Sequence, residues 1–254
     1  MGDIRPLLKA LICRRPGNEP HVLPFKESAI KTVLNDGSKH MKTNHQMWLW
    51  EKLGEKCKSS LKRNGFDAHF YSKGEEAKKG VIDMISGYET FGFGGSDTVR
   101  SLGLVDELAS MGKTVYDHWK EDLTPEETMN YRLNQGRCDC FLCSANAISL
   151  TGEIVNIDGV GNRVAASMFG PKKVVIISGM NKVTTDLDSA LKRAKEVAAP
   201  LRAKDFNIKP PCVETGICSD CHSPQRICNI TTILHRKPMM TDMSVVLVSE
   251  NLGY

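Results

Sequence analysis

The spacing of apolar residues changes along the chain: some segments have the spacing of short strands and others that of amphipathic helices. Asn44 is a candidate cap for the first helix, which ends at Gly65. The apolar stripe of this helix comprises Leu49, Leu53, Cys57 and Leu61. Further helices are predicted at residues 75–86, 162–169 and 186–199, the last ending before Pro200, and others after the caps Ser96 or Asp97 and Thr124. Strands are predicted at residues 66–72, 90–93, 113–116, 141–150, 153–157, 173–178, 230–234 and 244–248. This alternation predicts an α/β fold, in which a mostly parallel sheet is flanked by helices.

Residues 1–40 differ from the rest of the chain. They hold four of the 11 prolines and show no amphipathic period. Residues 37–41, Gly-Ser-Lys-His-Met, resemble a cloning junction ahead of a start at Met41, and a native flexible leader is the alternative. We predict a leader at residues 1–40 and one α/β domain at 41–254, with a cysteine-rich tail segment at 211–229.

The composition, with 41% hydrophobic and 25% charged residues, is that of a globular protein. No run approaches the ~18 apolar residues of a membrane helix, and the net charge is only +4. We therefore expect neither nucleic acid nor a membrane as a partner. The apolar stretch at residues 7–13 is interrupted by Lys9 and lacks a signal-peptide cleavage site, so we expect a cytoplasmic protein.

The strand at residues 90–93 runs into Gly94, Gly95 and Ser96, where a helix begins. Backbone N–H groups at such a turn can bind an anion, because glycine permits close approach and a helix start carries partial positive charge. The turn matches neither a dinucleotide-binding nor a Walker motif. Asp97 would also repel a phosphate close by, which favours a carboxylate or a more distant phosphate as the ligand. A tight turn that needs a positive φ is the alternative interpretation.

Two polar turns flank the predicted hairpin of residues 141–157. The candidate ligand-binding residues there are Ser144, Asn146, Asp158, Asn162 and Arg163. Arg163 is the strongest of them, because its planar fork binds two oxygens of a carboxylate or phosphate at once. Asn and Asp side chains also bond the local backbone in turns, which is the alternative for Asn146 and Asp158.

Seven of the nine cysteines fall in two clusters. One cluster consists of Cys138, Cys140 and Cys143. The other consists of Cys212, Cys218, Cys221 and Cys228. We interpret the first as core packing. The second has the spacing C-x5-C-x2-C-x6-C, and four thiolates suit Zn²⁺ or a [4Fe–4S] cluster. Unligated thiols and disulfides are the alternatives, and a reducing cytoplasm disfavours disulfides.

Five separated motifs resemble those of the lactate-utilisation (LUD) domain family. They are FGFGGS at residues 91–96, SANAI at 144–148, GEIVNIDG at 152–159, GNRVAA at 161–166 and GPKKV at 170–174. The similarity extends from about Met41 to Tyr254 and includes the cysteine-rich tail, which part of the family has. The resemblance implies a fold like that of ribose-phosphate isomerases and CoA transferases. It also implies a bacterial cytoplasmic protein.

Two hypotheses about function follow. The resemblance implies a link to iron–sulfur complexes that oxidise lactate to pyruvate. The chain would then be an accessory or redox subunit with a small anionic ligand, iron–sulfur protein partners and a metal or [4Fe–4S] site in its tail. The alternative is a stand-alone enzyme acting on a sugar phosphate or acyl-CoA, with a structural zinc. No residue matches a transferase nucleophile, so no catalytic residue is predicted. The sequence does not decide whether the protein forms a homo-oligomer.

Overall fold

The computed structural model describes residues 27–254, and their side chains from His45 on. The chain divides into Met1–His45 and a larger compact unit, Gln46–Tyr254. The part of the predicted leader at residues 1–26 lies outside the described residues. Helix α1 spans Glu27–Arg63, so Asn44 lies inside the helix and the prediction that it is the cap was wrong. Past Pro24 the sequence has no proline before Arg63 and is rich in Lys, Glu and Leu, which favour a helix.

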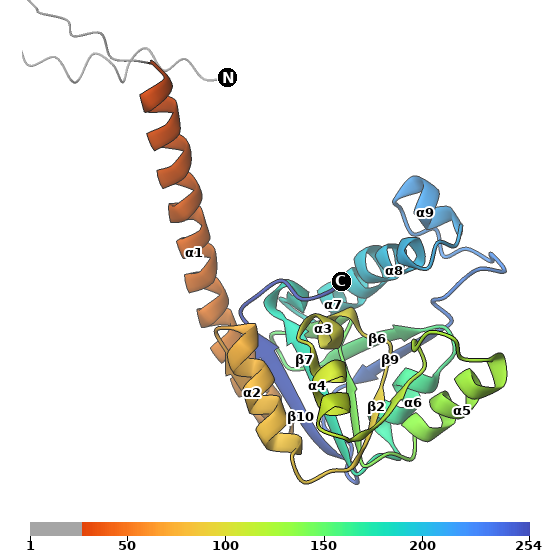
Figure 1. The fold of residues 1–254 in the computed structure, drawn as a ribbon. Coiled ribbons are helices and arrows are strands. Elements are labelled where there is room, and N and C mark those ends of the chain that lie inside the picture. The colour runs from red at the N-terminus through yellow and green to blue at the C-terminus, as the bar shows by residue number, and fades with distance from the viewer. Residues whose placement is uncertain (1–26) are drawn as a thin grey trace, which may run out of the picture. The chain divides into compact units, whose positions relative to one another are not determined.

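Six parallel strands form the main sheet of the larger unit, in the order β1-β10-β7-β4-β2-β3 (Figure 1). Their bounds are Asp67–Tyr71 (β1), Thr90–Phe93 (β2), Thr114–Asp117 (β3), Cys140–Cys143 (β4), Lys173–Gly179 (β7) and Asp242–Val248 (β10). The central strand β7 is buried along its whole length, as expected of a parallel strand covered on both faces. The predicted α/β fold with a parallel sheet is confirmed.

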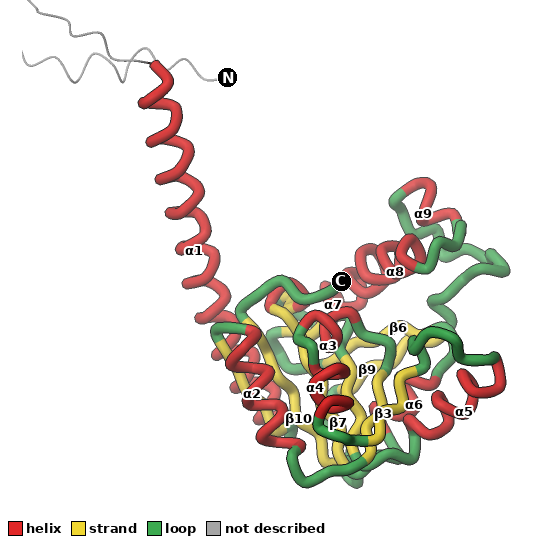
Figure 2. The backbone as a smooth tube through the Cα atoms, in the orientation of Figure 1, coloured by secondary structure: helices red, strands yellow, loops and turns green. Residues whose placement is uncertain are grey.

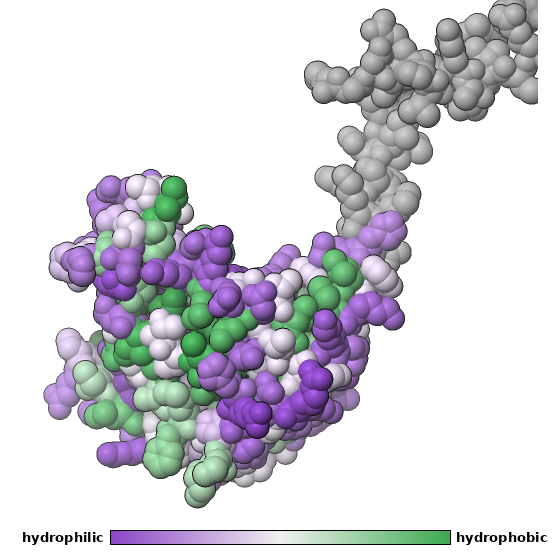
Figure 3. All heavy atoms as spheres, turned by 180° about the vertical axis from the view of Figure 1, so that it is seen from behind, coloured by the Kyte–Doolittle hydropathy of each residue, from purple (hydrophilic) through white to green (hydrophobic). Residues whose placement is uncertain are grey.

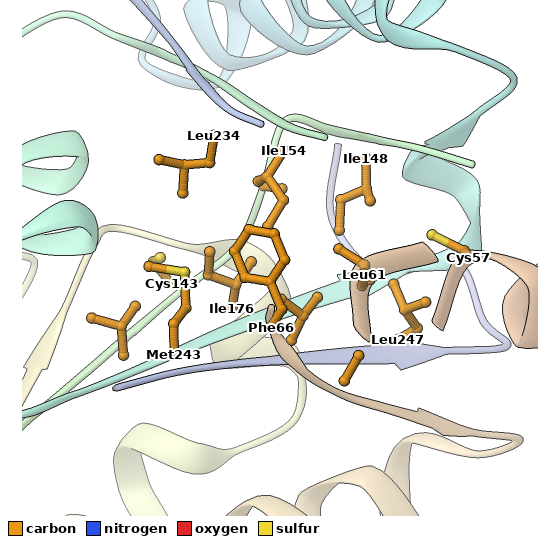
Figure 4. Packing of buried hydrophobic residues seen from close by; sticks show 14 of the residues in the cluster. Cys57, Leu61, Phe66, Cys143, Ile148, Ile154, Ile176, Leu234, Met243 and Leu247 are labelled. Carbon is orange, nitrogen blue, oxygen red and sulfur yellow. The ribbon is translucent and has the colours of Figure 1, made fainter. Parts of the chain in front are cut away.

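Helices cover one face of this sheet, and a mixed layer covers the other. Helices α2 (Gly74–Ile85), α3 (Asp97–Ser101) and α4 (Leu104–Ser110) pack their apolar side chains on the first face (Figure 1). The second face packs against the end of α1, α6 (Asn162–Met168) and a smaller sheet. Figure 4 shows Leu61, Phe66, Ile154 and Met243 meeting in this layer. Figure 3 shows the molecule from the side opposite to that of Figure 1, where polar and apolar residues are interspersed on the surface.

A second sheet has four strands in the order β8-β5-β6-β9. Their bounds are Ala147–Ser149 (β5), Ile154–Asp158 (β6), Val183–Thr184 (β8) and Ile230–Leu234 (β9). The hairpin of β5 and β6 is antiparallel, as predicted. The single strand predicted at residues 141–150 was wrong, because β4 and β5 belong to different sheets. The chain leaves the main sheet at Ser144, and the backbone N–H of Asn146 then bonds Asn156 and Val155 of β6.

Two further helical segments follow β3 and β8 in the chain, and the second of them packs against β5 and β6. Helix α5 (Pro125–Gln135) begins with the predicted cap Thr124, whose hydroxyl accepts from the backbone N–H of Glu127. Helix α7 (Leu187–Arg193) continues through a π-helical turn, Ala194–Ala198, into α8 (Ala199–Asp205). The predicted end before Pro200 was therefore wrong. Pro200 lies in the first turn of α8, where a missing N–H costs little.

Two short helical segments complete the chain: the 3-10 turn η2 (Met180–Lys182) after β7, and α9 (Pro211–Thr215) in the tail. Within residues 27–254, no helix has the length and hydropathy needed to cross a membrane.

Candidate functional site

A cavity of about 240 Å³ lies at the carboxyl edge of the six-stranded sheet. Its wall contains residues from the segments that follow five strands: Gly95 after β2, Trp119 after β3, Ser144 after β4, Lys182 after β7 and Tyr254 after β10. Parallel strands bring the segments after their carboxyl ends to one edge of the sheet, which is where ligands collect in open α/β folds. The topology therefore makes this cavity the candidate functional site.

All eight residues predicted to bind a ligand line this cavity. They are Gly94, Gly95, Ser96, Ser144, Asn146, Asp158, Asn162 and Arg163. Several of them are also committed to contacts within the protein. Asp158 accepts backbone N–H groups of Val160 and Gly161, and Asn146 accepts that of Ile157. These contacts agree with the alternative interpretation, in which Asn146 and Asp158 build their turns.

Arg163 ties the two polar turns together. Its Nε donates to Asp158 at 3.4 Å, and one terminal nitrogen donates to the Ser144 carbonyl and to Asn156 Oδ1. The other donates to Asn146 Oδ1 at 3.0 Å and to the Ile157 carbonyl. A guanidinium has five N–H bonds, and all five have protein acceptors here. In this conformation Arg163 shapes the cavity wall and has no N–H left for a ligand.

The turn after β2 needs its glycines for conformation and packing. Gly95 has a φ of 65°, and a Cβ there would lie 2.9 Å from the Trp119 ring. Ser96 caps α3 by accepting the N–H of Val99. The positive-φ interpretation is therefore correct for Gly95. The charge of Asp97, expected to repel an anion, is compensated by Arg202 at 2.8 Å.

Lys182 is a cavity residue that sequence reasoning missed. Its side chain is buried, with the residue only 3% exposed, and its Nζ donates to Thr98 Oγ1 at 2.8 Å and to Ser144 Oγ at 3.0 Å. Burial, reinforced by the positive charges of Arg193 and Arg163, lowers the pKa of Lys182 to about 7. A useful signal was present in the sequence, because Lys182 comes three residues after the most apolar strand of the chain.

A polar network beyond the carboxyl end of β3 holds His118 in the cavity wall. Asn162 Nδ2 donates to Gln135 Oε1 at 2.9 Å, and Gln135 Nε2 lies 2.8 Å from His118 Nδ1. The same amide nitrogen donates to the backbone carbonyls of Phe93 and Tyr116. Burial, together with the nearby Arg132, lowers the pKa of His118. The imidazole is therefore neutral at pH 7.

Aromatic and cationic side chains form another part of the wall. The Arg202 guanidinium lies 4.2 Å from the Trp119 ring centroid and 4.3 Å from that of Phe206. Arg202 is also paired with Asp97 and with Asp205, so its charge is compensated. Arg132 differs from it, because its Nε is buried and has no hydrogen-bond partner among the described residues.

Comparison with known proteins identifies the family. A family model described as the LUD domain matches residues 54–248. The chain belongs to the LUD-domain family. A crystal structure of a DUF162 family protein from Deinococcus radiodurans is similar over 79% of this chain and 98% of that chain, with 12% sequence identity and a TM-score of 0.46. The comparison with curated proteins gave no match.

The LUD domain match includes the cysteine-rich tail. Cys212 lies in α9, and the other three tail cysteines lie in the loop between α9 and β9 (Figure 2). All four line one small cavity beside α8, together with Asp220 and Arg226. Within residues 45–254, however, no three His, Cys, Asp or Glu side chains are arranged to hold a metal ion. The thiols share a site but would have to approach one another to bind one ion.

The upstream cysteines of this LUD domain belong to the core. Cys138, Cys140 and Cys143 are at most 2% exposed. Burial raises the pKa of Cys138 and of Cys143 to about 12, so both stay protonated at neutral pH. The packing interpretation is confirmed.

Proposed function

We propose that this LUD domain binds the anion of a small organic acid in the cavity, as an accessory subunit of a bacterial lactate-utilisation system. The supporting observation is the charge of the cavity wall. Arg163 is paired with Asp158 and Arg202 with Asp97, whereas the ion pairs of the described residues include neither Lys182 nor Arg132. The guanidinium of Arg132, whose Nε is buried and has no hydrogen-bond partner among the described residues, favours an anionic ligand.

The size of the cavity favours a small acid over an acyl-CoA. Pockets for drug-sized ligands measure roughly 300–1,000 Å³, and this cavity measures about 240 Å³. A three-carbon hydroxy acid or oxo acid fits within that space, whereas most of a coenzyme A ester would extend out of it into solvent. Family membership adds the lactate-utilisation context to this argument. Of the two hypotheses, we therefore prefer the accessory subunit to the stand-alone enzyme.

Calorimetric titration with lactate and pyruvate tests this proposal. We expect Arg132→Gln to weaken binding about tenfold, because one charge-assisted contact contributes about 1.4 kcal/mol. Arg236→Gln is the matched control, since Arg236 is exposed and outside the cavity wall. The proposal fails if neither acid binds the wild type, or if Arg132→Gln binds both acids as tightly as the control.

We also propose that the tail cysteines hold one metal centre, either Zn²⁺ or a [4Fe–4S] cluster. The donor set fits, because four thiolates from one short segment suit both groups. The eight described cysteines are all free thiols, which suits a reducing cytoplasm. A bound metal would stabilise the tail, since ligation and folding of the loop are coupled.

Metal analysis of anaerobically purified protein tests the metal centre. Cys218→Ser should lower the zinc or iron content and loosen the loop between α9 and β9. Cys57→Ser, in the buried core of the larger unit, should leave the metal content unchanged. Visible absorption with iron indicates the cluster, whereas zinc gives a colourless protein. Wild-type protein without zinc or iron would overturn this second proposal.

A further inference from the structure

The side chain of Lys182 ends between two hydroxyl groups in the cavity wall. Its Nζ donates to Thr98 Oγ1 and to Ser144 Oγ. The Thr98 hydroxyl donates its own hydrogen to the Leu252 carbonyl, and the Ser144 hydroxyl donates to that of Ala145. Both hydroxyls therefore accept from Lys182. A neutral amine satisfies both contacts with its two N–H bonds and keeps its lone pair on the remaining side of Nζ.

The surroundings of Lys182 favour that neutral amine. Burial disfavours the ammonium most, Arg193 and Arg163 add to this effect, and Asp97 opposes it, which places the pKa at about 7. About half of the molecules therefore hold the neutral amine at pH 7. Lys173 provides a contrast within the same chain. Its side chain is also buried, but its Nζ lies 3.0 Å from an oxygen of Asp242. Lys173 therefore carries a paired ammonium, whereas Lys182 presents an amine at the cavity.

We propose that Nζ of Lys182 is a nucleophile that forms a reversible imine with a small 2-oxo acid in this cavity. The inference rests on the proposed function, because the carboxylate of that acid is the anion which the cavity binds. A ketone carbonyl is the electrophile that fits, since its reaction with an amine needs no oxidant and releases only water.

The reaction balances without a further reagent. The Nζ lone pair forms a bond to C2 of the acid, and the carbonyl π electrons move to oxygen. A proton passes from nitrogen to that oxygen, giving a carbinolamine. The C–O bond then breaks as the nitrogen lone pair forms the C=N bond, and the hydroxyl leaves with a proton from solvent as water. The nitrogen of the resulting iminium releases its proton to solvent, which leaves the imine and restores the proton that was taken up. Hydrolysis reverses every step and returns the amine to its two hydroxyl partners.

Trapping with sodium borohydride tests this inference. Protein incubated with pyruvate and then reduced should gain the mass of pyruvic acid less one oxygen atom, because water is lost and two hydrogens are added. Peptide mapping should place the label on Lys182, with Lys173 and the exposed Lys192 as internal controls. Lactate, which has a hydroxyl in place of the carbonyl, should give no label. Lys182→Arg keeps the two hydrogen bonds and should not be labelled.

The outcomes separate this inference from the proposed function. If calorimetry shows pyruvate binding but reduction leaves Lys182 unlabelled, the imine is wrong and the binding function stands. If label appears equally on exposed lysines, the reaction is nonspecific and the inference is also wrong. If neither pyruvate nor lactate binds and no label appears, both proposals fail. Label confined to Lys182 and dependent on pyruvate supports the imine.

Discussion

Arg163→Met is expected to lower the free energy of unfolding by about 3 kcal/mol at pH 7, because it removes one member of a buried ion pair. The side chains of Arg163 and Asp158 are only 15% and 9% exposed, so water cannot replace the lost contacts fully. The Asn146 and Asn156 side-chain oxygens would each lose an N–H donor as well. Removing the guanidinium therefore releases both turns that shape the cavity.

Urea denaturation measures this loss. Arg163→Lys should give an intermediate loss, because an ammonium has three N–H bonds in place of five and no planar fork. Arg236→Met removes an exposed arginine and should change stability by less than about 0.5 kcal/mol. An equally small change for Arg163→Met would contradict the assignment of Arg163 as the residue that holds the turns.

The local turn chemistry of the site was predictable from sequence, and the partners of its charged groups were not. The glycine turn after residues 90–93 and the polar turns beside the predicted hairpin led to eight residues that all line the cavity. The sequence could not reveal that Arg163 has five acceptors, since these come from the segment between β4 and β5 and from residues 156–158 of β6. Arg163 was predicted to bind a ligand, but in the structure all its N–H bonds are used to hold the two turns.

The errors in the fold have local physical causes. Ser144 and Asn146 interrupt the apolar run of residues 141–150, and contacts of Asn146 with β6 carry the chain from one sheet to the other at this point. Pro200 looked like the end of a helix, because a proline cannot donate within one. The π-helical turn ahead of it lets the helix continue. Both errors arise where tertiary contacts override a local signal.

Lys182 was missed because only polar residues near a glycine or a turn were weighed as candidates. Applying the carboxyl-edge rule to β7 would have found it. What sequence could not predict is the environment, since Thr98, Ser144 and the two nearby arginines come from four separate segments. That environment costs stability, because burying an ammonium without a carboxylate partner is unfavourable.

Lys182→Met is accordingly expected to stabilise the protein by about 3 kcal/mol at pH 7. The pKa falls from 10.5 in the unfolded chain to about 7 in the folded state, so the unfolded state holds the proton more tightly. This difference corresponds to about 4 kcal/mol at pH 7, and losing two hydrogen bonds removes about 1 kcal/mol of the gain.

The gain from Lys182→Met should depend on pH in one direction. Below pH 7 it is constant, because both states of the wild type are protonated there, and it shrinks as the pH rises from about 7 to 10.5. Urea denaturation of wild type and variant at pH 6, 7, 8 and 9 measures the difference, in which titrations common to both proteins cancel.

Lys173→Met is the matched control: it removes an ammonium paired with Asp242, so it should give no gain. A Lys182→Met variant that is less stable than wild type at pH 7 would mean that Lys182 is a charged, well-paired group, and would remove the physical basis for its role as an amine nucleophile.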